Sequence, residues 1–209
     1  MPNIQGYESH ASEYEQWFQE NSEIYQAELK AIKRLLPNGK GVEIGAGSGL
    51  FSAPLAIETG IEPSAAMRDI AATRGLNFIE GVAESLPFED QSYDFAIFIT
   101  STCFLDNPQQ AYKEAHRVIK SNGSIIIAFL EKNSELGKVY EAHKSESPFY
   151  CDATFYSYQQ ITDFLSQAGF GNFYSVQTVL PESSKRNNTD VLEGHDQGAF
   201  VVIKADKVS

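Results

Sequence analysis

The chain has 209 residues, 42% of them hydrophobic, which suits a globular domain with a substantial core. Its formal net charge of −12 argues against a nucleic-acid backbone as the main partner, since phosphate binding needs clustered Lys and Arg. Two cysteines, Cys103 and Cys151, are too few for a secreted disulfide scaffold. There is no charged leader and no apolar run near the roughly 20 residues that span a bilayer. We therefore expect a cytoplasmic protein without a membrane span.

The first 37 residues are polar but carry aromatic side chains. From Ser12 to Leu36 the apolar positions recur at roughly helical intervals, which predicts one or two amphipathic helices that end at Pro37. Two interpretations remain open. The aromatic stripe packs as core against a sheet, or residues 1–37 form a helical lid that places Tyr14 and Trp17 over a bound ligand.

A short β-branched run from Gly41 to Gly45 leads into three glycines at alternate positions: Gly45, Gly47 and Gly49. This pattern predicts a buried strand and a tight turn into a helix that opens near Ser48. Glycine there lets the backbone approach a ligand closely. A dinucleotide site would need its third glycine where Leu50 stands. Glu43, two residues before the first glycine, would also lie awkwardly near a pyrophosphate but suits a cationic ligand.

This stretch resembles the first motif of the class I S-adenosylmethionine-dependent methyltransferases, which reads acidic-x-Gly-x-Gly-x-Gly. Glu43, Gly45, Gly47 and Gly49 match it position for position. The resemblance implies an α/β fold: a Rossmann-like, seven-stranded, mostly parallel sheet with an antiparallel edge strand and helices on both faces. It also implies S-adenosyl-L-methionine as cofactor, with S-adenosyl-L-homocysteine as product, and cofactor contacts that include Ala46.

A second strand over Thr59–Ile61 ends at Glu62, and a helix from Pro63 to Arg74 follows. Glu62 lies 19 residues after Glu43, the spacing at which an acidic residue meets a ribose in nucleotide-binding α/β folds. A carboxylate there can accept hydrogen bonds from both ribose hydroxyls. The alternative is an ordinary acid in the first turn of a helix. Glu62 and the adjacent Pro63 are therefore candidate cofactor contacts.

A third strand over Leu76–Ile79 leads into a loop with a further resemblance to the family. It implies that Val82 and Ala83 lie against the adenine and that Glu84 lies near the exocyclic amine. The next strand, Tyr93–Ile99, is nearly continuous in apolar residues, as expected when both faces of a parallel strand are covered.

The chain leaves this strand through a loop over residues 100–108 that begins at Thr100. We expect this loop to border cofactor and acceptor, because strand carboxyl ends form the ligand crevice. A helix over residues 107–120 and a strand over Ser124–Leu130 follow. Residues 131–156 then form a polar insert whose aromatic end surrounds Tyr150, either a cap over an acceptor pocket or a segment packed on the sheet edge.

After the insert, the pattern predicts a helix over residues 157–168 and two strands, Gly171–Leu180 and Gly198–Ala205, around a polar loop. These would complete the antiparallel edge of the sheet. No shift in composition marks a domain boundary, so we expect residues 1–209 to form a single domain.

The resemblance implies methyl transfer to a small-molecule acceptor by in-line displacement at the sulfonium methyl. An acceptor with an acidic proton would need a general base, for which His10, His143 and Tyr150 are weak candidates. No histidine spacing indicates a metal site. Two alternatives stay open: a non-catalytic module that binds the cofactor, and an NAD-dependent oxidoreductase, against which Glu43 and Leu50 argue.

Overall fold

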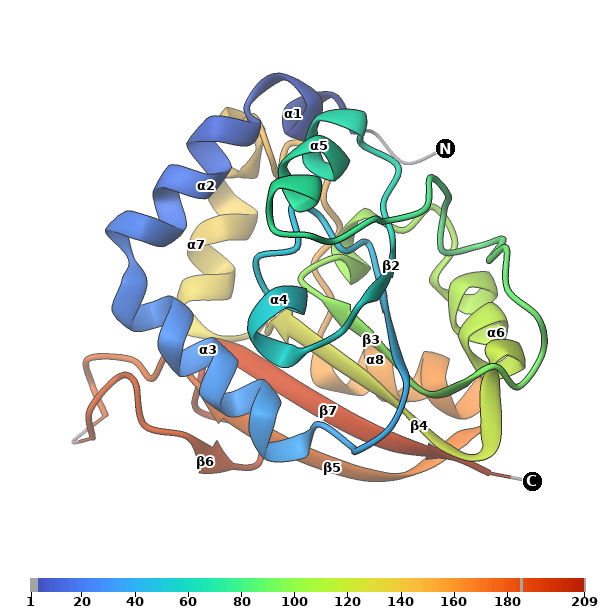
Figure 1. The fold of residues 1–209 in the computed structure, drawn as a ribbon. Helices are drawn as coiled ribbons and strands as arrows, with labels where there is room; N and C mark the ends of the chain where they lie inside the picture. The colour runs from blue at the N-terminus through green and yellow to red at the C-terminus, as the bar shows by residue number, and fades with distance from the viewer. Residues whose placement is uncertain (1–3, 185, 209) are drawn as a thin grey trace.

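A twisted sheet runs through the computed structural model, which describes residues 4–184 and 186–208 (Figure 1). Its seven strands lie in the order β2-β1-β3-β4-β7-β5-β6. Their bounds are β1 Gly41–Ile44, β2 Thr59–Ile61, β3 Tyr93–Ile99, β4 Ile119–Leu130, β5 Phe170–Thr178, β6 Leu192–Glu193 and β7 Phe200–Lys207. Strands β1 to β5 share one direction, and β7 and the edge strand β6 run opposite to them. The predicted Rossmann-like sheet with an antiparallel edge is confirmed.

Helices cover both faces of the sheet, as predicted. They are α1 Gln5–Ser9, α2 Ala11–Glu20, α3 Ser22–Leu35, α4 Ser52–Leu55, α5 Ala65–Thr73, α6 Pro108–Val118, α7 Glu135–His143 and α8 Tyr158–Gln167. Side chains of α6 and α8 join one buried apolar cluster with the sheet, and those of α3 and α4 join another. None of these helices is long and apolar enough to cross a membrane.

Strand β3 shows why both faces need cover. Ala96 and Phe98 belong to the cluster beneath α6 and α8, whereas Phe95, Ile97 and Ile99 belong to the cluster beneath α3. Alternate side chains of a strand point to opposite faces, so this apolar run buries both sides of the central sheet. The sheet and its covering helices therefore hold the carboxyl end of β3 in place.

Two predicted strands differ from the structure. The strand expected over Leu76–Ile79 is wrong: it is reduced to one bridge, between Ile61 and Ile79. Strand β2 has only three residues, so it offers few backbone groups with which a further strand could pair. Instead, the short β6 arises within the predicted polar loop, and β4 begins five residues earlier than expected, at Ile119. The β3–β4 register shifts between Tyr93 and Phe95, and residues 119–123, which precede the predicted strand, join β4.

The N-terminal segment forms α1, α2 and α3, so the predicted helical pattern is confirmed with a break at Asn21. Helix α3 packs on β5 and β7, and α1 packs on α5. In Figure 1, α2 passes along the same side of the molecule as α7. The segment thus approaches the end of the sheet at which β1 and β2 finish.

Candidate active site

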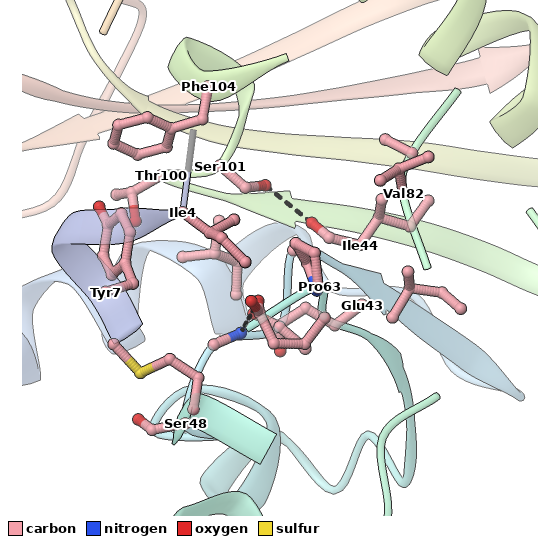
Figure 2. A pocket seen from close by; sticks show the side chains of 18 of the residues that line it. Ile4, Tyr7, Glu43, Ile44, Ser48, Pro63, Val82, Thr100, Ser101 and Phe104 are labelled. Atoms are coloured by element: carbon pink, nitrogen blue, oxygen red, sulfur yellow. Dashed lines mark hydrogen bonds between the residues drawn. The ribbon is translucent and has the colours of Figure 1, made fainter. Parts of the chain in front are cut away.

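A cavity opens where the carboxyl ends of β1, β2 and β3 meet (Figure 2). The chain passes from β1 to β2 on one side of the sheet order and from β3 to β4 on the other side, so the loops that leave β1 and β3 diverge. Ligands bind at such a switch point in open α/β sheets. This main cavity encloses about 860 Å³ of empty space, including its open mouth.

The turn after β1 forms one wall of the main cavity. Gly45 has φ +73°, and a Cβ there would lie 2.5 Å from the Cβ of Ser101, so the two loops touch. The Ser101 hydroxyl donates a 2.7 Å hydrogen bond to the Ile44 carbonyl, which ties the end of β1 to the loop after β3 (Figure 2). Gly47 has φ +54°, and a Cβ there would meet nothing within 4 Å. Its backbone is therefore open to a ligand, as the sequence predicts.

Glu62 is fixed at the end of β2, with its side chain only 7% exposed. Its carboxylate accepts 2.8 Å hydrogen bonds from the backbone N–H groups of Gly47 and Ser64. Burial raises the pKa of Glu62, and these two bonds oppose the rise. Each carboxylate oxygen keeps a further lone pair, so Glu62 could also accept hydrogen bonds from two ligand hydroxyls.

Glu43 lies deeper, 2% exposed, and accepts a hydrogen bond from the hydroxyl of Ser52. Burial raises the pKa of Glu43 to about 8, and the neighbouring Glu62 adds to the rise. No Lys, Arg or His lines the main cavity among the residues that the structure describes. A positively charged ligand would therefore be stabilised by these carboxyl groups.

Most of the predicted cofactor contacts come together in the main cavity. Eleven of the thirteen line it: Tyr14, Glu43, Gly45, Ala46, Gly47, Glu62, Pro63, Val82, Ala83, Glu84 and Thr100. Their individual roles stay predictions. Gly49 does not line the cavity, and a Cβ there would lie 2.5 Å from Leu76, so this glycine allows close packing. Trp17 also lies elsewhere, 40% exposed and packed edge-on against Phe18.

Other lining residues were missed by the sequence analysis. They include Ile4, Tyr7 and Met67, whereas Phe104 and Leu105 belong to the loop after β3 that was expected to border the site. Tyr7 and Phe104 come from segments far apart in the chain, yet their ring centroids lie 5.3 Å apart (Figure 2). Because α1 and the loop after β3 meet only in the folded chain, no local pattern could have identified this pair. The only local signal for Tyr7 is its place in the aromatic N-terminal segment.

A second, side cavity adjoins the main cavity at Thr100, which lines both. It encloses about 370 Å³ on the same measure and is mostly apolar and aromatic. Tyr150, Phe155 and Tyr156 line it, so the predicted insert contributes to its wall. Thr100 has φ +51°, a backbone conformation that a β-branched residue adopts rarely, and its N–H is held by the Ala128 carbonyl.

The three candidate bases differ in position. His10 lies 3.4 Å from Glu13, and His143 lies 3.7 Å from Glu146 with 65% of its side chain exposed. Neither histidine lines the two cavities. Tyr150 does line the side cavity, but burial raises the pKa of its hydroxyl well above the ordinary value, which makes it a poor base at neutral pH. Within residues 4–184 and 186–208, no group of three or more His, Cys, Asp or Glu side chains is placed to hold a metal ion.

Comparison with known proteins gives this site a family. A family model described as a methyltransferase domain matches residues 42–127. A Thermotoga maritima protein described as an S-adenosylmethionine-dependent methyltransferase, possible histamine N-methyltransferase, is 43% identical over 98% of this chain and 99% of its own, with a TM-score of 0.93. An uncharacterized protein of Methanocaldococcus jannaschii is 41% identical over 97% of this chain and 98% of its own length. The mitochondrial 2-methoxy-6-polyprenyl-1,4-benzoquinol methylase of Danio rerio is 32% identical over 64% of this chain and 38% of its own length.

The chain therefore belongs to the class I S-adenosylmethionine-dependent methyltransferases. It is an enzyme of that family, and its cofactor is S-adenosyl-L-methionine. The main cavity fits that cofactor: Gly47 leaves its backbone open, Glu62 offers acceptors for hydroxyls, and Glu43 is a buried acid without a cationic partner among the described residues.

Proposed function

We propose that this enzyme transfers the cofactor's methyl group to a small-molecule acceptor by in-line displacement. The observation that carries the proposal is Thr100, because the main and side cavities both reach it. A cofactor in the main cavity and an acceptor in the side cavity would approach each other at this residue. The bound cofactor supplies an electrophilic methyl on a sulfonium that already carries its leaving group.

The chain would then contribute mainly position and exclusion of water. Glu62 would hold the ribose, and Val82 and Ala83 would contact the adenine. Tyr7 and Phe104 would close the cavity above the reacting atoms, since their rings pack edge to face at the boundary of the site (Figure 2). The apolar lining of the side cavity would keep the acceptor's reacting atom desolvated.

The relatives support a small acceptor without choosing one. The T. maritima protein is described as a possible histamine N-methyltransferase, and the D. rerio relative is a benzoquinol methylase. Amines and quinols are therefore both reasonable acceptors to test. The cytoplasmic location expected from the sequence stays a prediction.

The test begins with thermal unfolding in the presence of S-adenosyl-L-homocysteine or NAD. At about 100 times its dissociation constant, a ligand that binds only the folded chain adds about 2.7 kcal/mol of stability. We expect stabilisation by S-adenosyl-L-homocysteine alone. Stabilisation by NAD alone would favour the alternative function, an NAD-dependent oxidoreductase.

Transfer of a tritiated methyl group to a broad acceptor panel then separates enzyme from binding module. Label on any acceptor supports the proposal. Tight cofactor binding with no label on any panel member would favour the non-catalytic module instead.

A further inference from the structure

Ser48 occupies a weakly restrained place in the glycine turn. It stands between Gly47 and Gly49, which have φ of +54° and +76°. A glycine can adopt many backbone conformations, so fixing it in one of them costs more entropy than fixing any other residue. Ser48 is nevertheless only 1% exposed and lines the main cavity (Figure 2). Contacts from other segments must therefore hold this part of the turn in shape.

Two charged side chains supply such contacts. The Ser48 hydroxyl donates a hydrogen bond to one carboxylate oxygen of Glu15 on α2, and the Ser48 carbonyl accepts a 3.0 Å hydrogen bond from Arg74. A second guanidinium nitrogen of Arg74 forms a salt bridge with the other oxygen of Glu15. The three residues thus form a closed triangle, which we call the Ser48 clamp. It joins α2, the glycine turn and the end of α5.

The Ser48 clamp is largely shielded from water. The side chain of Glu15 is 16% exposed and that of Arg74 is 25% exposed. Ion pairs in full contact with solvent contribute little, whereas shielded charge-assisted hydrogen bonds are stronger. The planar guanidinium can donate to a carboxylate and a carbonyl at the same time. Removing either charge would leave the other without its partner, so we expect the clamp to be lost as a unit.

The Ser48 clamp acts on the wall of the main cavity from outside. Neither Glu15 nor Arg74 lines the cavity, but Ser48 does, and so does Tyr14, the neighbour of Glu15 on α2. A shift of Ser48 would also move the adjacent Gly47, whose N–H donates to Glu62. The clamp therefore links the position of α2 to the position of groups that face the cavity.

We propose that Glu15 and Arg74 are positioning residues for the cofactor, which hold the glycine turn in its binding shape and couple that shape to the order of α2. The proposal goes beyond methyl transfer to a small acceptor, because it concerns how the cofactor is held. It requires that the cofactor occupy the main cavity and does not depend on the acceptor.

The binding test uses Glu15→Gln, Arg74→Gln and the double variant of the full-length protein, each titrated with S-adenosyl-L-homocysteine by calorimetry below its melting temperature. We expect each single variant to bind about tenfold more weakly. The double variant should lose less than about threefold more, because residues that act as a unit have non-additive effects. Glu20→Gln makes the same charge change at an exposed position of α2 and should leave the affinity unchanged.

Arg74→Lys tests whether the positive charge matters. A lysine ammonium keeps the charge beside Glu15 but lacks the planar fork. We expect Arg74→Lys to recover part of the affinity that Arg74→Gln loses. An affinity no better than that of Arg74→Gln would contradict the proposed role of the ion pair.

Hydrogen exchange, followed by mass spectrometry without ligand, tests the coupling between segments. In Arg74→Gln the amides of residues 11–20 and 45–50 should exchange at least about fivefold faster than in the parent protein, with those of β4 unchanged. Arg74 follows α5, so a purely local role would change the exchange of residues 65–76 alone. That result would contradict the coupling.

The binding data can overturn the proposal in two further ways: unchanged affinity in both single variants, or losses that add in full in the double variant. If the parent protein binds S-adenosyl-L-homocysteine in these experiments, only the role of Glu15 and Arg74 fails. If the parent protein does not bind it, the proposed function fails as well.

Discussion

At the scale of single residues, two buried carboxyl groups differ in their partners. Glu62 accepts hydrogen bonds from two backbone N–H groups, which lower the cost of its negative charge. Glu28 has none among the described residues, and burial raises its pKa to about 8. Hydrogen bonding to the charged form favours ionisation, whereas desolvation disfavours it. Glu62 is therefore suited to bind a neutral ligand hydroxyl, whereas burial favours the protonated form of Glu28.

Glu62→Ala should weaken binding of S-adenosyl-L-homocysteine by about 1 to 3 kcal/mol, because it removes a charge-assisted acceptor. Isothermal calorimetry measures the change. Glu58→Ala provides a matched control, since Glu58 lies just before β2 and is exposed. An unchanged affinity in Glu62→Ala would mean that Glu62 does not bind the cofactor and is an ordinary acidic residue near the start of a helix.

Glu28 also predicts how stability depends on pH. Its pKa is raised from 4.5 to about 8 in the folded chain, so the folded state keeps a proton that the unfolded state releases. The free energy of unfolding should therefore fall as pH rises through this window. Burial raises the pKa of Tyr14, Tyr25, Tyr140 and Tyr150, and the charge of Glu28 adds to the rise, so these four phenols stay neutral in this window.

Glu28→Gln should consequently be more stable than the parent protein at pH 8, by about 1 to 3 kcal/mol, and equally stable near pH 4. Urea unfolding at both pH values measures this difference, with no ligand present. Glu43 contributes to the parent slope with the same sign, so part of the slope should survive in the variant. Two curves that run parallel over the whole pH range would contradict the prediction.

At the scale of elements, α1 and α2 are fastened over the main cavity by two carboxylates. Glu8 accepts hydrogen bonds of 2.6 and 3.0 Å from the backbone N–H groups of Ala65 and Ala66, at the positive end of α5. Glu15 on α2 accepts hydrogen bonds from Ser48, in the glycine turn, and from Arg74. Tyr7 and Tyr14 line the cavity between these anchors. This arrangement supports the lid that we predict for the N-terminal segment.

Tyr14→Ala should lower the affinity for S-adenosyl-L-homocysteine by about 1 to 2 kcal/mol, since its ring lines the main cavity and would lose its buried contact area. Trp17→Ala is the matched control: it removes a larger ring from the same helix, but from a position 40% exposed outside the cavity. Calorimetry on both variants, with melting temperatures alongside, separates binding from stability. An equal loss in the two variants would mean that the helix acts as a whole and that Tyr14 makes no specific contact.

At the scale of the whole molecule, the sheet brings separate segments to one edge. The loops after β1, β2 and β3 supply Gly47, Glu62 and Thr100, and β3 is held between apolar layers on both faces of the sheet. Helices α1 and α2, from the N-terminal segment, and the insert, which follows β4, also reach this edge. The main cavity is therefore a product of the topology, and the side cavity depends on contacts between the insert and the loop after β3.

Much of the cofactor site follows from the sequence alone. The alternate glycines, the acid before them and the acid 19 residues later are local patterns, set by the conformations that a backbone can adopt and the hydrogen bonds that a carboxylate can accept. The order of helices and strands follows from periodicity for the same reason. Gly49 fitted the motif, yet its missing side chain allows contact with Leu76, which belongs to a different segment.

Only the tertiary structure decided which aromatic residues meet. Trp17 and Tyr14 stand three residues apart on one helix, but Tyr14 lines the cavity and Trp17 faces outward. The pairing of Tyr7 with Phe104 and the stacking of Phe104 on Tyr150 join segments separated by many residues. Such contacts depend on how helices pack on the sheet, and packing is set by shape and burial across the whole chain, which no local pattern encodes.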